Sequence, residues 1–228
     1  MKLTGDDGRE YLDFLAGIGV CSLGHGDPAV LSALEAQTKK LMHVSNYFYI
    51  EQRGQVAALL SKLANDDVDG ARVLADAIAA GDETTAAALG APAADEQVWE
   101  TFFANSGAEA NEGAIKCARK YSVDTYGEGR NKVITLVNSF HGRTLATLTA
   151  TGQDVFHHDF GPFPGNFDYV PAGDFAALEK AADKDTCAVM MELVQGEGGV
   201  VALDADYVAR VAAFCREKDI LVIVDEVQ

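Results

Sequence analysis

Residues Trp99–Tyr121 have the sequence WETFFANSGAEANEGAIKCARKY, which predicts a strand, a tight turn and a helix in immediate succession. The aromatic run Trp99–Ala104 is typical of a buried strand, and the Asn-Ser-Gly triplet that follows has the composition of a turn. Small apolar residues then recur at helical spacing up to Tyr121. We therefore expect a strand that leads directly into a helix.

The start of this helix has the signature of an anion site. Ser106 and Glu109 have the S-x-x-E spacing of a capping box, which leaves the N–H groups of Gly107 and Ala108 free. Such N–H groups at a helix N-terminus suit an anion, most naturally a phosphate. The spacing also fits an ordinary turn between a strand and a helix, because neither G-x-x-x-x-G-K-[ST] nor G-x-G-x-x-G is present.

Size and composition indicate a globular protein. The chain has 228 residues, of which 48% are hydrophobic, so it is long enough to bury a substantial core in one large domain. Its net charge of −17 argues against nucleic acid or an anionic membrane as a partner. The sequence contains neither an apolar run of about 18 residues nor a signal-peptide core at its start, and we expect a cytoplasmic protein with no membrane contact.

Cysteine and histidine give no sign of a metal site. Cys21, Cys117, Cys187 and Cys215 have no C-x-x-C spacing and lie among apolar residues, so we expect buried free thiols. The His157-His158 pair is expected in a solvated loop, because adjacent side chains point in different directions.

An alternation of strands and helices begins at Trp99. Before it, we expect a strand or hairpin in 9–20, helices at Pro28–Lys40 and Gln52–Ala64, and an acidic, alanine-rich segment at 65–97 that is part helix and part loop. The later expected elements are strands at Lys132–Val137, near Tyr169-Val170, at Cys187–Glu192 and at Ile220–Val224, and helices at Asp174–Ala182 and Ala205–Lys218. This order predicts an α/β fold with a mainly parallel sheet.

Ligands of such sheets bind beyond the carboxyl ends of the strands. The segments that follow the strands begin at Ser106, Ser139, Glu192 and Asp225, and all four can face one cleft. Asp225 has two interpretations: a Mg²⁺ ligand of a nucleotide hydrolase, or the partner of a protonated ring nitrogen in an electron-sink cofactor. The first needs a phosphate-loop lysine, which the sequence lacks, so the second is favoured.

Four motifs in this order resemble a known family: NSGAEAN, NSFHGRTLATLTATGQ, VQGEGGV and LVIVDEVQ. Together they are similar to the class III pyridoxal-phosphate aminotransferases of fold type I, from Gly8 to Gln228 apart from residues 65–97. The similarity is greatest to family members that act on N-acetylornithine. The resemblance implies pyridoxal 5'-phosphate as cofactor and a sheet with helices on both faces. It also implies that 1–50 is an N-terminal segment, that 51–228 is part of the large domain, and that 65–97 is an insertion.

The resemblance assigns a cofactor-binding role to Ser106, Gly107, Ala108, Phe140, His141, Asp225, Val227 and Gln228. Gly107 and Ala108 would hold the phosphate, Phe140 and Val227 would lie on the two ring faces, and Asp225 would bind the ring nitrogen.

The other implied roles concern the ring hydroxyl, the loop and the substrate. Gln228 would lie beside the ring hydroxyl, and His141 would either contact the cofactor or brace its loop. Arg143 would bind the substrate α-carboxylate as a two-pronged clamp, which suits arginine better than lysine. Glu197 resembles the family glutamate that pairs with a second substrate-binding arginine.

The implied activity moves the δ-amino group of N-acetylornithine to 2-oxoglutarate, in arginine biosynthesis, in a homodimer. The Schiff-base lysine is expected beyond Gln228, so the chain is expected to be an incomplete large domain that is inactive alone. Related enzymes act on ornithine, succinylornithine, succinyldiaminopimelate or 4-aminobutyrate, and these substrates stay open. A non-catalytic binding domain of the same fold is the alternative from another functional class.

Overall fold

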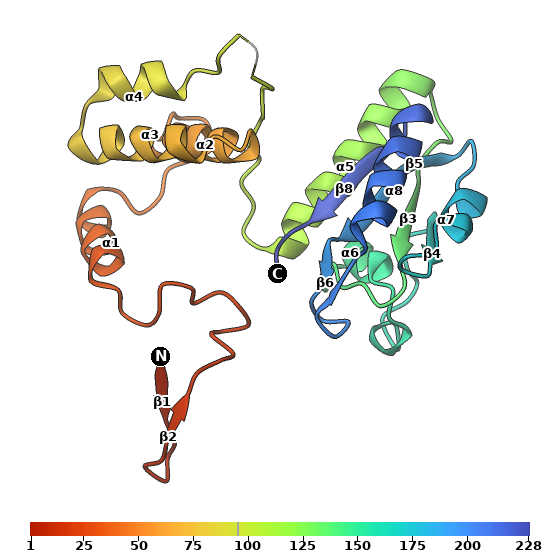
Figure 1. Cartoon of the computed structure of the whole chain (residues 1–228), viewed down its shortest axis with the longest axis horizontal. Helices are drawn as coiled ribbons and strands as arrows, with labels where there is room; N and C mark the ends of the chain where they lie inside the picture. The colour runs from red at the N-terminus through yellow and green to blue at the C-terminus, as the bar shows by residue number, and fades with distance from the viewer. Residues whose placement is uncertain (95) are drawn as a thin grey trace. The chain divides into compact units, whose positions relative to one another are not determined.

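The computed structural model of this protein describes residues 1–94 and 96–228. The chain forms two compact units, Met1–Thr101 and Phe102–Gln228 (Figure 1). The predicted boundary after residue 50 and the predicted insertion at 65–97 stay predictions.

The first unit consists of a small hairpin and helices. Its elements are β1 (Lys2–Thr4), β2 (Glu10–Leu12), α1 (Pro28–Lys40), α2 (Glu51–Ala64), α3 (Val68–Ala80) and α4 (Glu83–Gly90). The hairpin predicted in 9–20 is confirmed only over β2, which pairs antiparallel with β1. Beyond it, Ala16, Gly17, Ile18 and Gly19 all have positive φ, which turns the chain out of the strand conformation.

Local capping explains why α1 matches its predicted bounds. The Asp27 carboxylate accepts the N–H groups of Ala29 and Val30 at 2.9 and 3.1 Å, and Pro28 occupies the first turn, where its missing N–H costs nothing. Helix α2 begins one residue before its predicted start, at Glu51.

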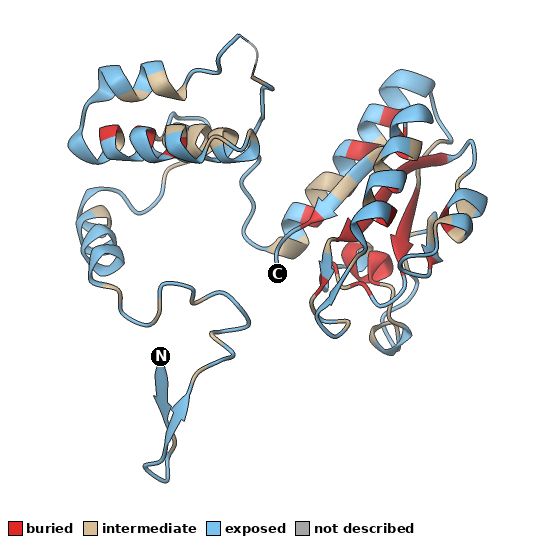
Figure 2. Ribbon diagram, viewed as in Figure 1, coloured by how far each residue is buried: buried red, intermediate tan, exposed pale blue. Residues whose placement is uncertain are grey.

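The acidic segment 65–97 is part helix and part loop, as predicted. Helix α3 buries Ala71, Leu74 and Ala77 on one face, which Figure 2 shows as the buried patch of this unit. The predicted acidic residue Asp95 lies outside the described residues.

A four-stranded sheet forms the centre of the second unit. Its strands are β3 (Lys132–Leu136), β4 (Phe167–Val170), β5 (Thr186–Glu192) and β8 (Leu221–Asp225). They lie in the order β4-β3-β5-β8, and every neighbouring pair is parallel. A separate antiparallel pair, β6 (Val194–Gln195) with β7 (Val201–Ala202), follows β5.

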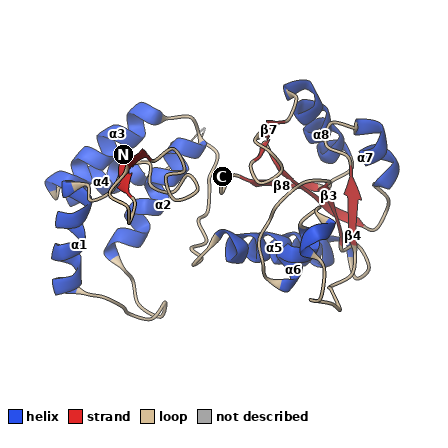
Figure 3. Cartoon of the chain, turned by 90° about the horizontal axis from the view of Figure 1, so that it is seen from below, coloured by secondary structure: helices blue, strands red, loops and turns tan. Residues whose placement is uncertain are grey.

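Helices cover both faces of this sheet, as predicted (Figure 3). They are α5 (Gly107–Tyr126), α6 (Leu145–Ala150), α7 (Phe175–Ala181) and α8 (Ala205–Glu217), with a short 3-10 helix at Asp154–Phe156. On one face, Ile115 of α5 and Ala150 of α6 pack against the strands, and on the other Leu178 of α7 and Val211 of α8 do so. The strand order and these layers confirm the predicted α/β fold.

Two predictions about this part of the chain are wrong, the strand at Trp99–Ala104 and the burial of Cys117. Trp99–Ala104 forms no strand, and Phe102 is 77% exposed. Among the residues that the structure describes, no strand pairs with this run, and a strand without a neighbour leaves its backbone groups unbonded. Strand β8, predicted within Ile220–Val224, lies at the edge of the described sheet. Cys117 is exposed, because it lies on the side of α5 away from Ile115.

Candidate functional site

The carboxyl ends of β3, β5 and β8 meet the N-terminus of α5 within the second unit. After β3 comes the loop 138–144, after β5 the turn 196–199, and after β8 the last residues of the chain. A methyl group built on Gly107 would lie 2.8 Å from a Val227 methyl, which shows that the end of β8 reaches the first turn of α5 (Figure 1).

The predicted capping box begins α5, with one difference. The Glu109 N–H donates to the Ser106 Oγ at 3.2 Å, and the Glu109 carboxylate accepts the N–H of Asn105 at 2.7 Å, one residue before the predicted partner. The Ser106 carbonyl accepts the N–H of Ala110. The first-turn N–H groups of Gly107 and Ala108 have no acceptor within the helix, so this end can bind an anion.

The loop after β3 packs closely on this first turn. Gly142 has a φ of +133°, and a Cβ there would lie 2.7 Å from the Ala108 Cβ and 2.7 Å from the Thr147 Oγ1. A residue with a side chain cannot occupy this position without moving the loop. Gly142 therefore fixes how near Phe140 and Arg143 lie to the N-terminus of α5.

Asp225 is the centre of a buried hydrogen-bond network. Its Oδ2 accepts the Asn111 Nδ2–H at 2.7 Å and bonds the His141 Nδ1 at 2.8 Å, and its Oδ1 accepts the Val227 N–H at 3.1 Å. Burial acts to raise the pKa of Asp225, but the hydrogen bonds from His141, the Val227 N–H and Asn111 outweigh it and hold the pKa below its usual value. The carboxylate is therefore charged, although it is buried.

His141 lies behind this carboxylate, and its side chain is completely buried. A carboxylate oxygen only accepts hydrogen bonds, so the Nδ1 carries the proton that it shares with Asp225. The His141 N–H donates to the Thr151 Oγ1 at 2.9 Å, and the carbonyl accepts from Asn111. Within 1–94 and 96–228, the Nε2 has no hydrogen-bond partner. The structure thus shows bracing contacts for His141.

Two buried residues of this site had no predicted role. Asn111 joins α5 to Asp225, and Glu192 joins two loops, since its carboxylate accepts the N–H of Phe140 at 2.9 Å and that of Gly196 at 3.3 Å. Burial raises the pKa of Glu192, although the hydrogen bonds from these N–H groups and the charge of His141 act to lower it. Both residues have a sequence signal: Asn111 ends the motif NSGAEAN and shares the buried helix face of Ile115, and Glu192 begins the segment that follows β5.

The remaining predicted residues lie at the rim of the site. Arg143 is exposed, and its guanidinium lies over the rings of Phe156 and Phe140 at 4.3 and 5.4 Å. Phe140 is half-buried and packs edge-on against Phe156. Glu197 is exposed in the turn between β6 and β7, and Gln228 lies beside Gly196.

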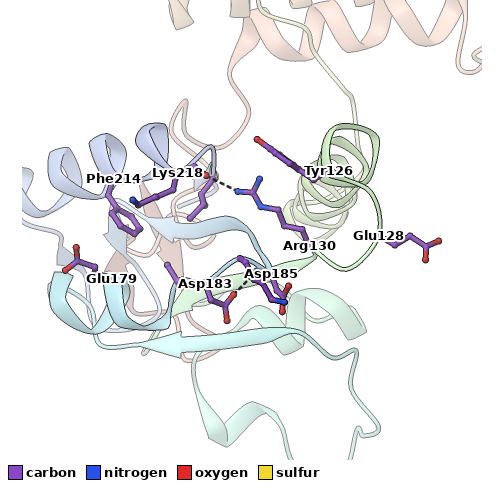
Figure 4. Close-up of a pocket in the computed structure, with 11 residues that line it drawn as sticks. Tyr126, Glu128, Arg130, Glu179, Asp183, Asp185, Phe214 and Lys218 are labelled. Carbon is purple, nitrogen blue, oxygen red and sulfur yellow. Dashed lines mark hydrogen bonds between the residues drawn. The ribbon is translucent and has the colours of Figure 1, made fainter.

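A cavity of about 610 Å³ lies at the opposite, amino end of the strands (Figure 4). Arg130 crosses it and donates to the carbonyls of Thr186, Lys218 and Asp219. None of the predicted site residues lines this cavity, and ligands of parallel sheets bind at the other end. It is therefore not the candidate site.

Three further features concern metal sites, His157 and membrane-spanning helices. In the described part of the chain, no cluster of His, Cys, Asp and Glu could hold a metal ion. His157 was predicted in a solvated loop, but it is half-buried and bonds the Leu148 carbonyl at 2.9 Å. Of the helices that the structure describes, none has the length and apolar character that a membrane crossing requires.

Comparison with known proteins gives consistent matches. The sequence profile of the family "Aminotransferase class-III" matches residues 1–228. Acetylornithine aminotransferase of Haemophilus ducreyi is 47% identical over 97% of this chain and 49% of its own length, and that of Methanocaldococcus jannaschii is 40% identical over 100% and 49%. The chain thus spans about half the length of the curated relatives it matches.

Solved structures of aminotransferases also align with this chain. N-acetylornithine aminotransferase from Stenotrophomonas maltophilia aligns with a TM-score of 0.70 and 31% identity over 98% of this chain and 47% of that one. Ornithine aminotransferase from Toxoplasma gondii, described with pyridoxal phosphate at its active site, aligns with a TM-score of 0.77 and 28% identity over 98% and 46%. With the parallel sheet and the motifs at its carboxyl end, these matches show that the chain belongs to the class III aminotransferases.

Proposed function

We propose that this chain forms the cofactor-binding half of an aminotransferase that moves the δ-amino group of N-acetylornithine to 2-oxoglutarate. The buried, anionic Asp225 beside the N-terminus of α5 carries this proposal, because the two groups are arranged for a ligand with a phosphate and a protonated ring nitrogen. The matched relatives named acetylornithine aminotransferase support the substrate.

The residues present fit pyridoxal 5'-phosphate. Ser106, Gly107 and Ala108 form a helix N-terminus suited to the phosphate. Among the described residues, the Val227 N–H is the donor to the Asp225 Oδ1, so this oxygen keeps a lone pair for a ring N–H. Asp225 is bonded to Asn111, one turn along α5 from Gly107, and four residues of helix rise about 6 Å. Phosphate and ring nitrogen would thus bind at opposite ends of one small site.

The cofactor, when bound, supplies an electron-withdrawing ring that takes up negative charge from the carbon bearing the reacting amino group. Asp225 would hold the proton on the ring nitrogen, and the site is pre-arranged for this because the lowered pKa of Asp225 keeps its carboxylate charged. Phe140 and Val227 would hold the two ring faces and exclude water, and Gln228 would lie beside the ring hydroxyl.

Substrate binding is assigned to the rim. Arg143 is exposed to the site, and its stacking on Phe156 and Phe140 holds the guanidinium close to the proposed ring position. We infer that it binds the substrate α-carboxylate through two parallel hydrogen bonds. Glu197 would pair with a second arginine supplied from outside this chain.

Other parts of the proposal come from the family resemblance. The lysine that binds the cofactor covalently and transfers the proton would lie outside this chain, and the 228-residue chain alone would not turn over. The enzyme would be a cytoplasmic homodimer of arginine biosynthesis. Lys116 is not a candidate for this lysine, because it lies exposed on α5.

The test compares amino donors on the purified enzyme that contains this chain, with pyridoxal phosphate and 2-oxoglutarate present. We expect glutamate formation to be much faster with N-acetylornithine than with ornithine or 4-aminobutyrate. A strong preference for unacetylated ornithine would overturn the substrate, and an enzyme that binds no pyridoxal phosphate would overturn the reaction class.

A further inference from the structure

Asn111 occupies an unusual position for an amide. It lies in the second turn of α5, only 6% exposed, on the same face as the core residues Ile115 and Ala118. Asparagine is a poor helix former, and burying its amide is unfavourable unless the amide is hydrogen-bonded. The amide therefore makes hydrogen bonds at this position that an apolar side chain could not make.

The Asn111 amide nitrogen donates two hydrogen bonds, and both acceptors belong to the candidate site. The Nδ2 donates to the Asp225 Oδ2 at 2.7 Å and to the His141 carbonyl at 2.9 Å. One amide thus ties α5, the loop 138–144 and the end of β8 together. These three elements carry the phosphate-binding turn, Phe140 and Asp225.

Asn111 and His141 bond the same oxygen of Asp225 through different kinds of donor. The imidazole can gain or lose a proton, whereas the amide stays a neutral donor at every pH. Two donors on Oδ2 fix the rotation of the carboxylate and leave Oδ1 as the oxygen with spare acceptor capacity. The amide therefore acts on a different oxygen from the one that would meet the cofactor.

We propose that Asn111 is a positioning residue that holds the Asp225 carboxylate charged and oriented toward the ring nitrogen of the cofactor. This inference rests on the proposed function, because it assigns Asn111 to the same cofactor site. It also links the two ends of the site, since one helix carries both the phosphate-binding turn and the group that orients Asp225.

The first test is Asn111→Leu in the purified enzyme, with the apparent Kd for pyridoxal phosphate as the readout. Leucine has a similar size but no donor, so Asp225 loses one of the bonds that stabilise its charge. A hydrogen bond to a charged group corresponds to roughly a ten- to hundredfold change in an equilibrium constant, and we expect the Kd to rise by this factor. Ser122→Ala is the matched control, because Ser122 is equally buried on α5 and its Oγ donates to the Arg130 carbonyl, far from Asp225.

The second variant, Asn111→Asp, keeps the shape of the side chain and makes the effect depend on pH. Two carboxylates at this separation share one proton, and the protonated carboxyl group introduced by this substitution can donate to Asp225 as the amide does. As the pH rises and this proton leaves, the two charges repel each other. Glu192, whose pKa is raised by burial, and the imidazole of His141 lie nearby, so each curve is compared with that of the wild type.

We expect Asn111→Asp to bind pyridoxal phosphate almost as well as wild type at acid pH and progressively less well as the pH rises. Asn111→Leu should be impaired equally at all pH values, and Ser122→Ala should lose stability without losing affinity. Equal affinity loss in Asn111→Leu and Ser122→Ala, or a loss in Asn111→Asp that does not change with pH, would overturn the inference. Failure of the wild type to bind the cofactor would instead overturn the proposed function.

Discussion

Replacing Gly142 by alanine tests how the loop 138–144 is held on α5. Gly142 has a φ of +133°, and the new methyl group would lie 2.7 Å from the Ala108 Cβ and 3.0 Å from the Ala108 Cα. The backbone conformation costs about 1–3 kcal/mol for a residue with a side chain, and the overpacking adds about 1–3 kcal/mol. Together these terms predict a destabilisation of about 2–6 kcal/mol.

Gly129→Ala is the matched control for this substitution. Gly129 has a φ of +108°, and a methyl group there would meet nothing within 4 Å. It should therefore show the conformational cost of about 1–3 kcal/mol without the overpacking. The difference between the two variants isolates the contact between Gly142 and Ala108.

Urea unfolding of both variants, and their apparent Kd for pyridoxal phosphate, measure the two consequences. We expect Gly142→Ala to lose about 1–3 kcal/mol more than Gly129→Ala and to bind the cofactor more weakly, because the loop that carries Phe140 must move away from α5. Equal losses of stability, with unchanged affinity in both variants, would refute this reasoning.

Two further substitutions separate stability from binding. Gly107→Ala places a methyl 2.8 Å from a methyl of Val227, whose side chain is exposed and can move. The free energy of unfolding in urea should therefore change by less than about 1 kcal/mol, while the affinity for pyridoxal phosphate should fall. Glu192→Gln turns an amide N–H₂ toward the N–H of Phe140 or Gly196. At low pH this should lower the free energy of unfolding by about 1–3 kcal/mol. The pKa of Glu192 is raised in the folded state, so wild-type stability falls as the pH rises from 4.5 through the folded pKa. The difference in the free energy of unfolding between wild type and Glu192→Gln should therefore shrink over that pH range. A difference that stays constant with pH would contradict the raised pKa of Glu192.

Local signals in the sequence were sufficient for most elements of the fold. Helix α1 matches its predicted bounds because Asp27 and Pro28 fix its start, and α5 begins at the predicted cap residue, Ser106. The strands β3 and β5 were predictable as apolar runs because both are buried on two faces. The run Trp99–Ala104 has the same character, but a strand also needs a partner, which a local pattern does not reveal.

The roles of the site residues were predictable only where the family resemblance assigned them. Ser106, His141 and Asp225 belong to recognisable motifs, and the structure brings them to one end of the sheet. Asp225 lies 114 residues from Asn111, and Phe140 lies 52 residues from Glu192, so these two contacts depend on the assembled sheet. A buried polar residue within an apolar pattern indicates that such a partner exists, but it does not identify the partner.

The most direct test of the central claim is a crystal structure of the enzyme that contains this chain, grown with pyridoxal 5'-phosphate. We expect the phosphate to accept the N–H groups of Gly107 and Ala108, and the ring nitrogen to lie within hydrogen-bond distance of the Asp225 Oδ1. Cofactor bound elsewhere, or with its ring nitrogen turned away from Asp225, would contradict the account.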